Sequence, residues 1–400
     1  MITGGLTFGG STTLLCNLGG EFVRQEVPVV VLSLEKENAF ARDFESLGVP
    51  VIVQDDQREV FEDRVRHTLE ALAEFQPTAV VACVGAASFE ILRYVPEGVR
   101  RGGMVQTDHV DCYDAASPYA ASLDVMIGVS EHIRETLEAK PEFKHAAIHC
   151  MTSGVLVPQT FTPRRLGPGD PLRILYLGRL DRGQKRVHLF PEILSGLVQS
   201  GIPFTWTIVG EGAEKGFLEQ NMKTARADQQ VRVAGKVAYE KVPDLLAKND
   251  VFLLASEAEG LPLTLLEAMA QGTVPVVSDL PSGIRELLDD NCGRLVRPEN
   301  IAGYAEAIAW LYQHPEDWRR LSLNAHEKMV RNYSTRAMAE RWLAAFPPGD
   351  AGIKWPERWT VRPPLDHKNT LYFSPAARVF RRIALRLRTR LTALRKRKAA

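Results

Sequence analysis

The chain has 400 residues, of which 45% are hydrophobic and 24% charged, and its 49 basic and 49 acidic side chains cancel. No apolar run approaches the roughly 18 residues of a membrane-spanning helix, no basic leader opens the chain, and the five cysteines show no paired spacing. These features exclude an integral membrane protein and a structural zinc site, and we expect a cytoplasmic protein with free thiols and two middle-sized domains flanking a cleft.

The first half of the chain alternates short apolar runs with helix-length segments. Strands are predicted over residues 27–34, 49–53, 79–84, 103–107 and 125–129. Helices are predicted between them, including residues 131–139, which Ser130 would cap. Strands that are apolar throughout are buried on both faces, as in a parallel sheet covered by helices. Residues 1–165 are therefore predicted to form a Rossmann-like α/β domain.

A segment rich in proline and glycine, residues 162–171, predicts a linker to a second domain. Strands are predicted beyond it over residues 172–178, 204–210, 231–235, 251–256 and 274–279. Helices are expected over residues 299–346, and an irregular connector, 347–375, carries two tryptophans that we expect to pack on a domain surface. The fold class is thus α/β, with a second doubly wound domain over 172–330.

The segment EAEGLPLTLLE begins just after the strand predicted at 251–256. Open parallel sheets bind ligands beyond the carboxyl ends of their strands, where loops lead into helices. Pro262 suits the first turn of such a helix. The N–H groups near Gly260, Leu261 and Leu263 could hold a phosphate at the positive end of the helix dipole. This segment therefore predicts a phosphate site.

Two glutamates of this segment are candidates for sugar binding. Glu267 would lie on the second helical turn, where its carboxylate could accept hydrogen bonds from a ribose diol. Glu259, on the loop, would face the sugar or the acceptor. The alternative is that both are solvated side chains.

The longer string EGLPLTLLEAMAQGTVPVVSDLPSGIRELLDDNCGRLV resembles the signature of retaining GT-B glycosyltransferases of glycosyltransferase family four, the glycosyl transferases group 1. In that family two glutamates separated by seven residues lie at the nucleotide-sugar site. Glu259 and Glu267 match them, the second as ribose holder, whereas Glu257 has the wrong spacing. The resemblance implies two Rossmann-like domains facing across a cleft, with the acceptor held by residues 1–165 and the nucleotide-sugar by residues 172–330.

The segment LRILYLGRLDRGQKR resembles the family's Gly-Arg-Leu motif, here Gly178, Arg179 and Leu180, followed by a lysine. Arginine as a planar fork and lysine as a point charge would neutralise a diphosphate. The commoner family spacing is one residue shorter than that from Arg179 to Lys185. Lys185 and Arg186 are therefore both candidates for the phosphate contact.

Two further segments resemble the nucleotide side of the family's site. VGEGAEKGFLE would place Gly210 and Gly212 in a turn under the nucleotide. VRVAGKVAYEKVPDLLAKND would bring the backbone of Gly235, Lys236 and Val237 to the nucleobase. Backbone contacts leave no sequence signal for the identity of the base.

The first half resembles the family at fewer positions. In GGLTFGGSTTLLCNLGGEF, Gly9 and Gly10 would begin a helix that points towards the acceptor and the donor phosphate. The strand expected before this helix is either short, or the given sequence starts within it. MVQTDHVDCY carries Asp108 and His109 where the family has a His-Asp pair, so His109 is the candidate for the sugar contact and Asp108 the alternate. NYSTRAMAERWLAAF resembles the terminal helix, here 331–346, that crosses back to the first domain.

The resemblance implies a glycosyltransferase that moves a sugar, by family analogy a hexose on UDP, to a glycan or glycolipid with retention of configuration. The candidate catalytic residues are Asp108, His109, Arg179, Lys185 and Glu259. Stabilising the departing diphosphate would require no metal or cofactor. The sequence accordingly has no Asp-x-Asp metal motif. Of its two Asp-Asp pairs, Asp55-Asp56 lies in the first domain and Asp289-Asp290 in a loop expected after a helix. A nucleotide-sugar epimerase and a non-catalytic nucleotide-sugar binder are the alternatives.

The C-terminal tail is basic, with ten arginines and lysines and no acid in residues 371–400. Phe380, Ile383, Leu387, Leu391 and Leu394 are spaced by three, four, four and three residues, as on one face of a helix. Residues 376–400 therefore predict an amphipathic helix on an anionic membrane surface. A partly disordered tail, or one packed on its own domain, is equally open. No nucleic-acid partner is expected, because no basic stripe occurs upstream.

Overall fold

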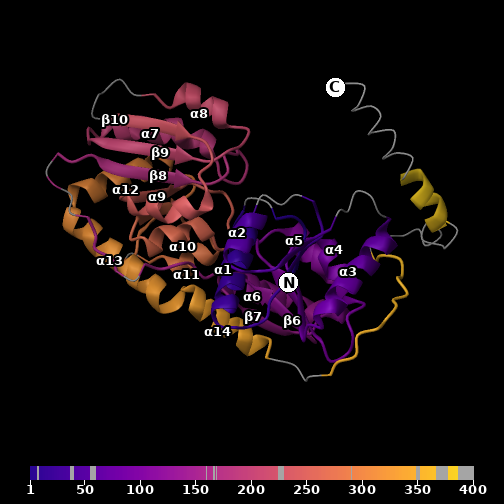
Figure 1. The fold of residues 1–400 in the computed structure, drawn as a ribbon. Coiled ribbons are helices and arrows are strands. Elements are labelled where there is room, and N and C mark those ends of the chain that lie inside the picture. Colours follow the sequence, from indigo (N-terminus) through magenta and orange to yellow (C-terminus); the bar gives the residue numbers. More distant parts are fainter. Residues whose placement is uncertain are drawn as a thin grey trace. The chain divides into compact units, whose positions relative to one another are not determined.

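The structure, a computed structural model, describes residues 1–6, 9–36, 40–54, 60–158, 160–164, 167, 169–223, 229–289, 291–347, 352–365 and 377–385. The chain divides into two compact units (Figure 1). Unit 1 comprises residues 1–128, 134–151 and 339–400, and unit 2 comprises residues 129–133 and 152–338.

Unit 1 is built on a seven-stranded parallel sheet in the order β3-β2-β1-β4-β5-β6-β7. Its strands are β1 (Ile2–Thr3), β2 (Val31–Ser33), β3 (Val51–Val53), β4 (Ala79–Ala82), β5 (Arg100–Val105), β6 (Val125–Gly128) and β7 (Ala147–Cys150). The first strand has two residues, yet it pairs with β2 and β4 at the centre of the sheet. The sequence did not predict β7, because this edge strand is partly exposed and lacks a continuous apolar run.

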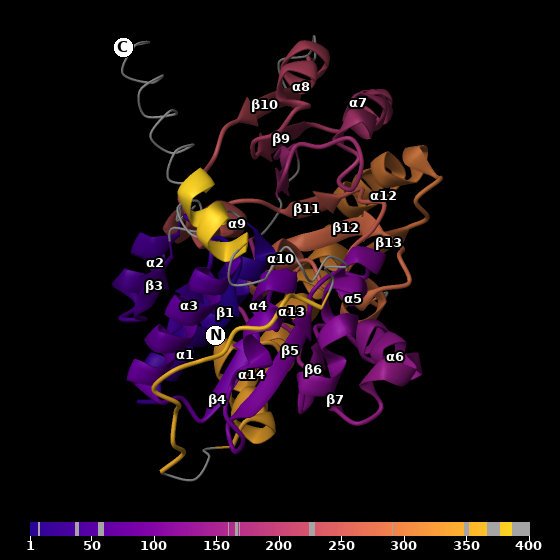
Figure 2. The ribbon, with the colours of Figure 1, turned by 90° about the vertical axis from the view of Figure 1, so that its right-hand side faces the viewer.

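The helices of unit 1 follow the strands in alternation (Figure 2). They are α1 (Gly10–Arg24), α2 (Ala41–Ser46), α3 (Phe61–Phe75), α4 (Ala86–Leu92), α5 (Val110–Ala116) and α6 (Glu131–Ala139), whose first turn is counted with unit 2. Ser130 Oγ accepts a hydrogen bond from the N–H of Ile133 at 3.3 Å, which confirms the predicted cap of α6.

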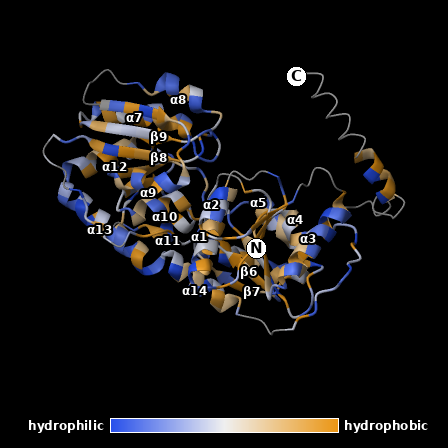
Figure 3. Ribbon diagram, viewed as in Figure 1, coloured by the Kyte–Doolittle hydropathy of each residue, from blue (hydrophilic) through white to orange (hydrophobic). Residues whose placement is uncertain are grey.

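Unit 2 contains a six-stranded parallel sheet in the order β10-β9-β8-β11-β12-β13. Its strands are β8 (Leu172–Leu177), β9 (Phe204–Val209), β10 (Gln229–Ala234), β11 (Val251–Leu254), β12 (Val274–Ser278) and β13 (Arg294–Val296). Strands of both units are coloured largely as hydrophobic in Figure 3, as expected for sheets covered on both faces. The edge strand β13 was not predicted, because its three residues are only partly buried and include an arginine.

The helices of unit 2 are α7 (Phe190–Gln199), α8 (Lys215–Asn221), α9 (Val242–Ala247), α10 (Leu263–Ala270), α11 (Gly283–Leu287), α12 (Ile301–Gln313) and α13 (Pro315–Asn332). The following helix, α14 (Thr335–Ala345), leads the chain from unit 2 into unit 1. Beyond it, Phe346 packs where a side chain on Gly102 would lie, since a Cβ there would be 2.6 Å from the ring. Trp359 of the connector is buried, as expected.

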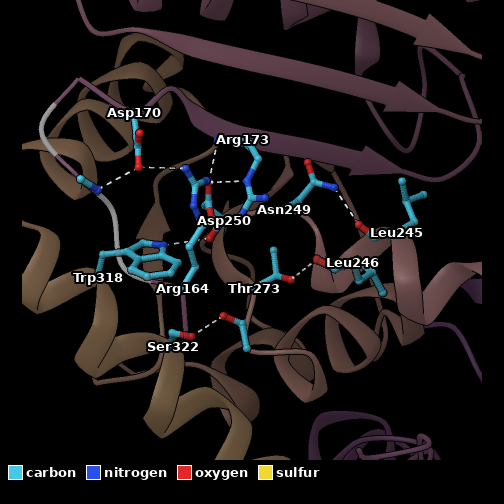
Figure 4. A network of polar contacts seen from close by, with 12 residues as sticks. Arg164, Asp170, Arg173, Leu245, Leu246, Asn249, Asp250, Thr273, Trp318 and Ser322 are labelled. Atoms are coloured by element: carbon cyan, nitrogen blue, oxygen red, sulfur yellow. Dashed lines mark hydrogen bonds and ion pairs between the residues drawn. The ribbon is translucent and has the colours of Figure 1, made fainter. Parts of the chain in front are cut away.

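A buried aspartate joins the linker, β8 and α13 within unit 2 (Figure 4). Asp250 accepts hydrogen bonds from the guanidinium of Arg164 at 2.9 Å and from the backbone and guanidinium of Arg173 at 2.9, 3.0 and 2.8 Å. Its carbonyl oxygen accepts from Trp318 Nε1 at 2.9 Å. These bonds fix the start of β11, and thereby help to place the loop at its other end.

Candidate functional site

Two loops of unit 2 meet at the carboxyl ends of the neighbouring strands β8 and β11. The N–H of Glu257 donates to the carbonyl oxygen of Gln184 at 2.8 Å, and Gln184 Nε2 donates to the carbonyl oxygen of Ala258 at 3.0 Å. Residues 178–186 and 255–260, here called the β8 loop and the β11 loop, therefore form one surface.

The centre of this surface is an ion pair between Lys185 Nζ and Glu259 Oε1, from residues 74 positions apart. The lysine side chain is 14% exposed and the glutamate side chain 6% exposed. Ser256 Oγ donates a second hydrogen bond to the same carboxylate oxygen at 2.6 Å. Two charges removed from water to this extent are stable only as partners, so each fixes the position of the other.

Arg179 lies at the start of the β8 loop with its guanidinium exposed. It donates to Gln184 Oε1 and lies 3.5 Å from Asp181 Oδ2. Its carbonyl oxygen accepts from the buried hydroxyl of Tyr176 at 2.5 Å. Arg179 is thus held at its backbone and leaves a positive charge facing solvent.

The structure distinguishes the two candidate cations that follow in the loop. Lys185 contacts Glu259, whereas Arg186 turns to Glu257 at 3.0 Å and to the carbonyl oxygen of Pro298 at 3.2 Å. Arg186 has a φ of 50°, a left-handed conformation that is uncommon outside glycine. Sequence reasoning missed the roles of Gln184 and Glu257, because neither has a recognisable spacing and only the pairing of the loops brings them together.

The helix after the β11 loop, α10, begins at Leu263, with Pro262 as its cap residue rather than in the first turn. The N–H groups of Leu263 and Thr264 lie at a helix start, where no carbonyl of the helix can accept from them. Glu267 occupies the second turn, as expected. Burial raises the pKa of Glu267 to about 8, although a hydrogen bond with Tyr239 opposes the shift.

Glycines allow the neighbouring turns to approach the β8 loop. A Cβ on Gly210 would lie 1.8 Å from the carbonyl oxygen of Gly178, and one on Gly212 would lie 2.2 Å from that of Leu180. Both have positive φ, 154° and 156°. Only glycine fits these positions, which supports the turn predicted at Gly210.

Gly235, Lys236 and Val237 directly follow β10, the edge strand of the sheet. The side chain of Lys236 is exposed, and Gly235 packs against Glu211, whose Oε1 would be 2.9 Å from an added Cβ. These residues and Tyr239 therefore lie on one continuous segment between β10 and α9.

The remaining candidates lie in unit 1. Gly9 is the cap residue of α1 and Gly10 is its first residue, so the two glycines open a helix as expected. Asp108 accepts a hydrogen bond from Tyr113 Oη at 2.8 Å; burial, and then this bond, raises the pKa of Tyr113. His109 is exposed and caps α5, with Nδ1 accepting from the N–H of Asp111 at 3.4 Å. Both residues follow β5, and each forms a hydrogen bond with a residue of α5, the helix that begins directly after them.

No cluster of three or more metal-ligating side chains occurs among the residues that the structure describes. Asp55, Asp56 and Asp290 lie outside those residues. The described helices include none long and apolar enough to cross a bilayer.

Residues 159–328 match the sequence model of the family described as glycosyl transferases group 1. The match covers most of unit 2. Similar curated proteins include the putative colanic acid biosynthesis glycosyltransferase WcaL of Escherichia coli, 37% identical over 195 residues, or 46% of this chain and 47% of WcaL. The amylovoran biosynthesis glycosyltransferase AmsK of Erwinia amylovora is 39% identical over 150 residues, 35% of each chain. The chain spans about half the length or less of these curated relatives.

Solved structures resemble both units of the chain. TarM of S. aureus, solved with fondaparinux, alpha-GlcNAc-glycerol and UDP, has a TM-score of 0.70 at 13% identity, covering 87% of this chain and 99% of TarM. HepE of Anabaena, solved with UDP, has a TM-score of 0.68 at 14% identity, covering 86% of this chain and 97% of HepE. The predicted fold class, GT-B with two doubly wound domains, is confirmed.

Proposed function

We propose that the protein is a glycosyltransferase that moves a sugar from a nucleotide-sugar to a glycan, glycolipid or similar acceptor. One observation carries the proposal: Lys185 and Glu259, from loops 74 positions apart, meet at the carboxyl edge of a group 1 sheet. Relatives named for colanic acid and amylovoran biosynthesis, and similar folds solved with UDP, favour a polysaccharide-type acceptor and a UDP-hexose donor.

The donor would lie along the β8 and β11 loops. Arg179, which already faces solvent, and the free N–H groups at the start of α10 would hold the diphosphate. Lys185 would share its charge between Glu259 and a phosphate oxygen. Glu267 would accept from the ribose hydroxyls, and the segment from Gly235 to Val237 would meet the base through backbone groups.

Catalysis would consist mainly of stabilising the leaving group. The bond between the anomeric carbon and the phosphate oxygen breaks as the acceptor oxygen bonds to that carbon, and negative charge accumulates on the diphosphate. Preorganised cations at this position lower the barrier without a metal ion. We further propose a same-face reaction in which the departing phosphate takes the acceptor proton, with His109 or Asp108 contacting the sugar. NMR of the product would contradict this mechanism if the new linkage were inverted.

A non-catalytic nucleotide-sugar binder is the second candidate. It is favoured by unit 1, where Asp108 is bonded to Tyr113 and His109 caps a helix. For both candidate functions we propose that the protein is cytoplasmic and that its basic tail, residues 376–400, binds it to an anionic membrane surface.

Thermal unfolding with a panel of UDP, GDP, ADP and their common sugars tests the proposal. A ligand at about a hundred times its dissociation constant adds about 2.7 kcal/mol to the free energy of unfolding, which raises Tm by a few degrees. We expect one nucleotide to shift the wild type and the surface control Glu219→Gln, but not Glu267→Ala. If no nucleotide shifts the folded wild type, the donor site is refuted. Release of nucleotide on adding acceptor separates transfer from binding alone.

A further inference from the structure

The tail helix, residues 377–385 and yellow in Figures 1 and 2, is attached to unit 1 by its arginines. Arg381 donates to both carboxylate oxygens of Glu62, and Arg378 and Arg382 pair with Asp63. The basic face of this helix is therefore the face that contacts the domain.

The two acidic partners lie on the first turn of α3 and are buried. Asp63 also accepts from Arg66 at 3.2 Å. Burial raises the pKa of Asp63, but hydrogen bonds from Arg382 and Arg378 outweigh it and lower that pKa to about 2. Asp63 is thus charged at neutral pH, as are the arginines that it pairs with.

The apolar face of the tail helix points outward. Phe380 is 75% exposed, Val379 55% and Ile383 52%, whereas the side chain of Arg381 is only 13% exposed. An amphipathic helix that packs on its own domain buries its apolar face and exposes its charges. This helix has the opposite orientation, so its apolar face is available to a different partner.

An anionic lipid bilayer fits this face and the chain that follows it. Amphipathic helices bind such surfaces by inserting apolar side chains at the headgroup boundary while nearby cations attract anionic lipids. Residues 386–400 add seven arginines and lysines and no acid.

We propose that Glu62 and Asp63 hold the tail helix with Val379, Phe380 and Ile383 outward, and that these three side chains are the surface that inserts into an anionic membrane. The inference rests on the proposed function, in which the tail brings the enzyme to lipid-linked acceptors. It adds the residues that insert and the pair that orients them.

Vesicle sedimentation tests the inserting surface. The full chain is mixed with vesicles of phosphatidylcholine alone or with one third phosphatidylglycerol. We expect Phe380→Ser/Ile383→Ser to weaken binding to the anionic vesicles ten- to hundredfold. The matched control, Leu323→Ser/Val330→Ser, removes exposed apolar side chains of α13 and should leave binding unchanged.

Equal binding of Phe380→Ser/Ile383→Ser and wild type would overturn the proposal, because cations alone would then suffice. A change of oligomeric state, with vesicle binding unaltered, would assign the face to a second copy and would also overturn it.

Limited trypsin digestion tests the orienting pair without any membrane. We expect Glu62→Gln/Asp63→Asn to speed cleavage after Arg378, Arg381 and Arg382 at least fivefold, as read by mass spectrometry. Glu70→Gln/Glu74→Gln makes the same charge change at exposed positions of α3 and should not. Equal rates in the two variants would refute the contact. The rise in Tm on adding nucleotide should be the same in all these variants as in the wild type. The nucleotide test therefore fails or succeeds independently of the tests of the tail helix.

Discussion

The loops after β8 and β11 in unit 2 and the segment after β5 in unit 1 both follow parallel strands, but they are held differently. In unit 2, residues 74 positions apart form buried ion and hydrogen bonds across two loops. In unit 1, Asp108 accepts a hydrogen bond from Tyr113 and His109 accepts one from Asp111, and both partners belong to α5. The first arrangement is preorganised by tertiary contacts, and the second by local capping. Substitutions should therefore affect unit 2 far more than unit 1.

The largest effect is expected for Lys185→Ala. This change leaves Glu259 buried beside Ser256 without its cation, which should cost about 3–5 kcal/mol in the free energy of unfolding. Urea denaturation measures the loss. The double variant Lys185→Met/Glu259→Gln removes both charges and should recover most of it. Wild-type stability of Lys185→Ala would show that the pair is not preorganised.

Glu267 should make the stability of the protein fall as pH rises. Burial raises its pKa from the ordinary 4.5 to about 8 in the folded protein, so between these two pH values the folded state holds a proton that the unfolded chain has lost. Stability then falls with pH, by at most about 1.4 kcal/mol per pH unit. Glu267→Gln should flatten this slope in urea titrations between pH 5 and 8, while Glu219→Gln should retain it.

Substitutions of Arg186, the residue of the β8 loop with a left-handed backbone conformation, should change the free energy of unfolding by a smaller amount. Arg186→Ala and Arg186→Gly both remove the contacts to Glu257 and Pro298, but only glycine adopts the φ of 50° without strain. The alanine variant should be less stable than the glycine variant by about 1 kcal/mol. Equal urea midpoints would argue that the loop relaxes.

The smallest effect on stability is expected in unit 1. His109→Ala removes an exposed helix cap and should cost about 0.5–1 kcal/mol, and His109→Asn, which restores a good cap, should recover it. Turnover provides the sharper measurement. If His109 contacts the sugar, His109→Asn stays slow despite its restored Tm, whereas recovery of both would leave His109 as a cap alone.

The sequence predicted ten of the thirteen strands found in the described residues, in their order along the chain, and the short first strand was anticipated. Burial on both faces of a parallel sheet requires continuous apolar runs, and these are visible locally. The edge strands β7 and β13 lack such runs and were missed. The cap at Ser130 and the helix openings at Gly9 and Gly10 were likewise local patterns.

The sequence by itself determined the α/β alternation, the motif residues and the amphipathic tail, because each depends on neighbours within a few positions. The tertiary structure decided which cation meets Glu259, since that depends on β8 and β11 becoming adjacent strands. It also decided which face of the tail helix contacts α3. Helical periodicity separates two faces, but only the buried carboxylates of Glu62 and Asp63 select the basic one.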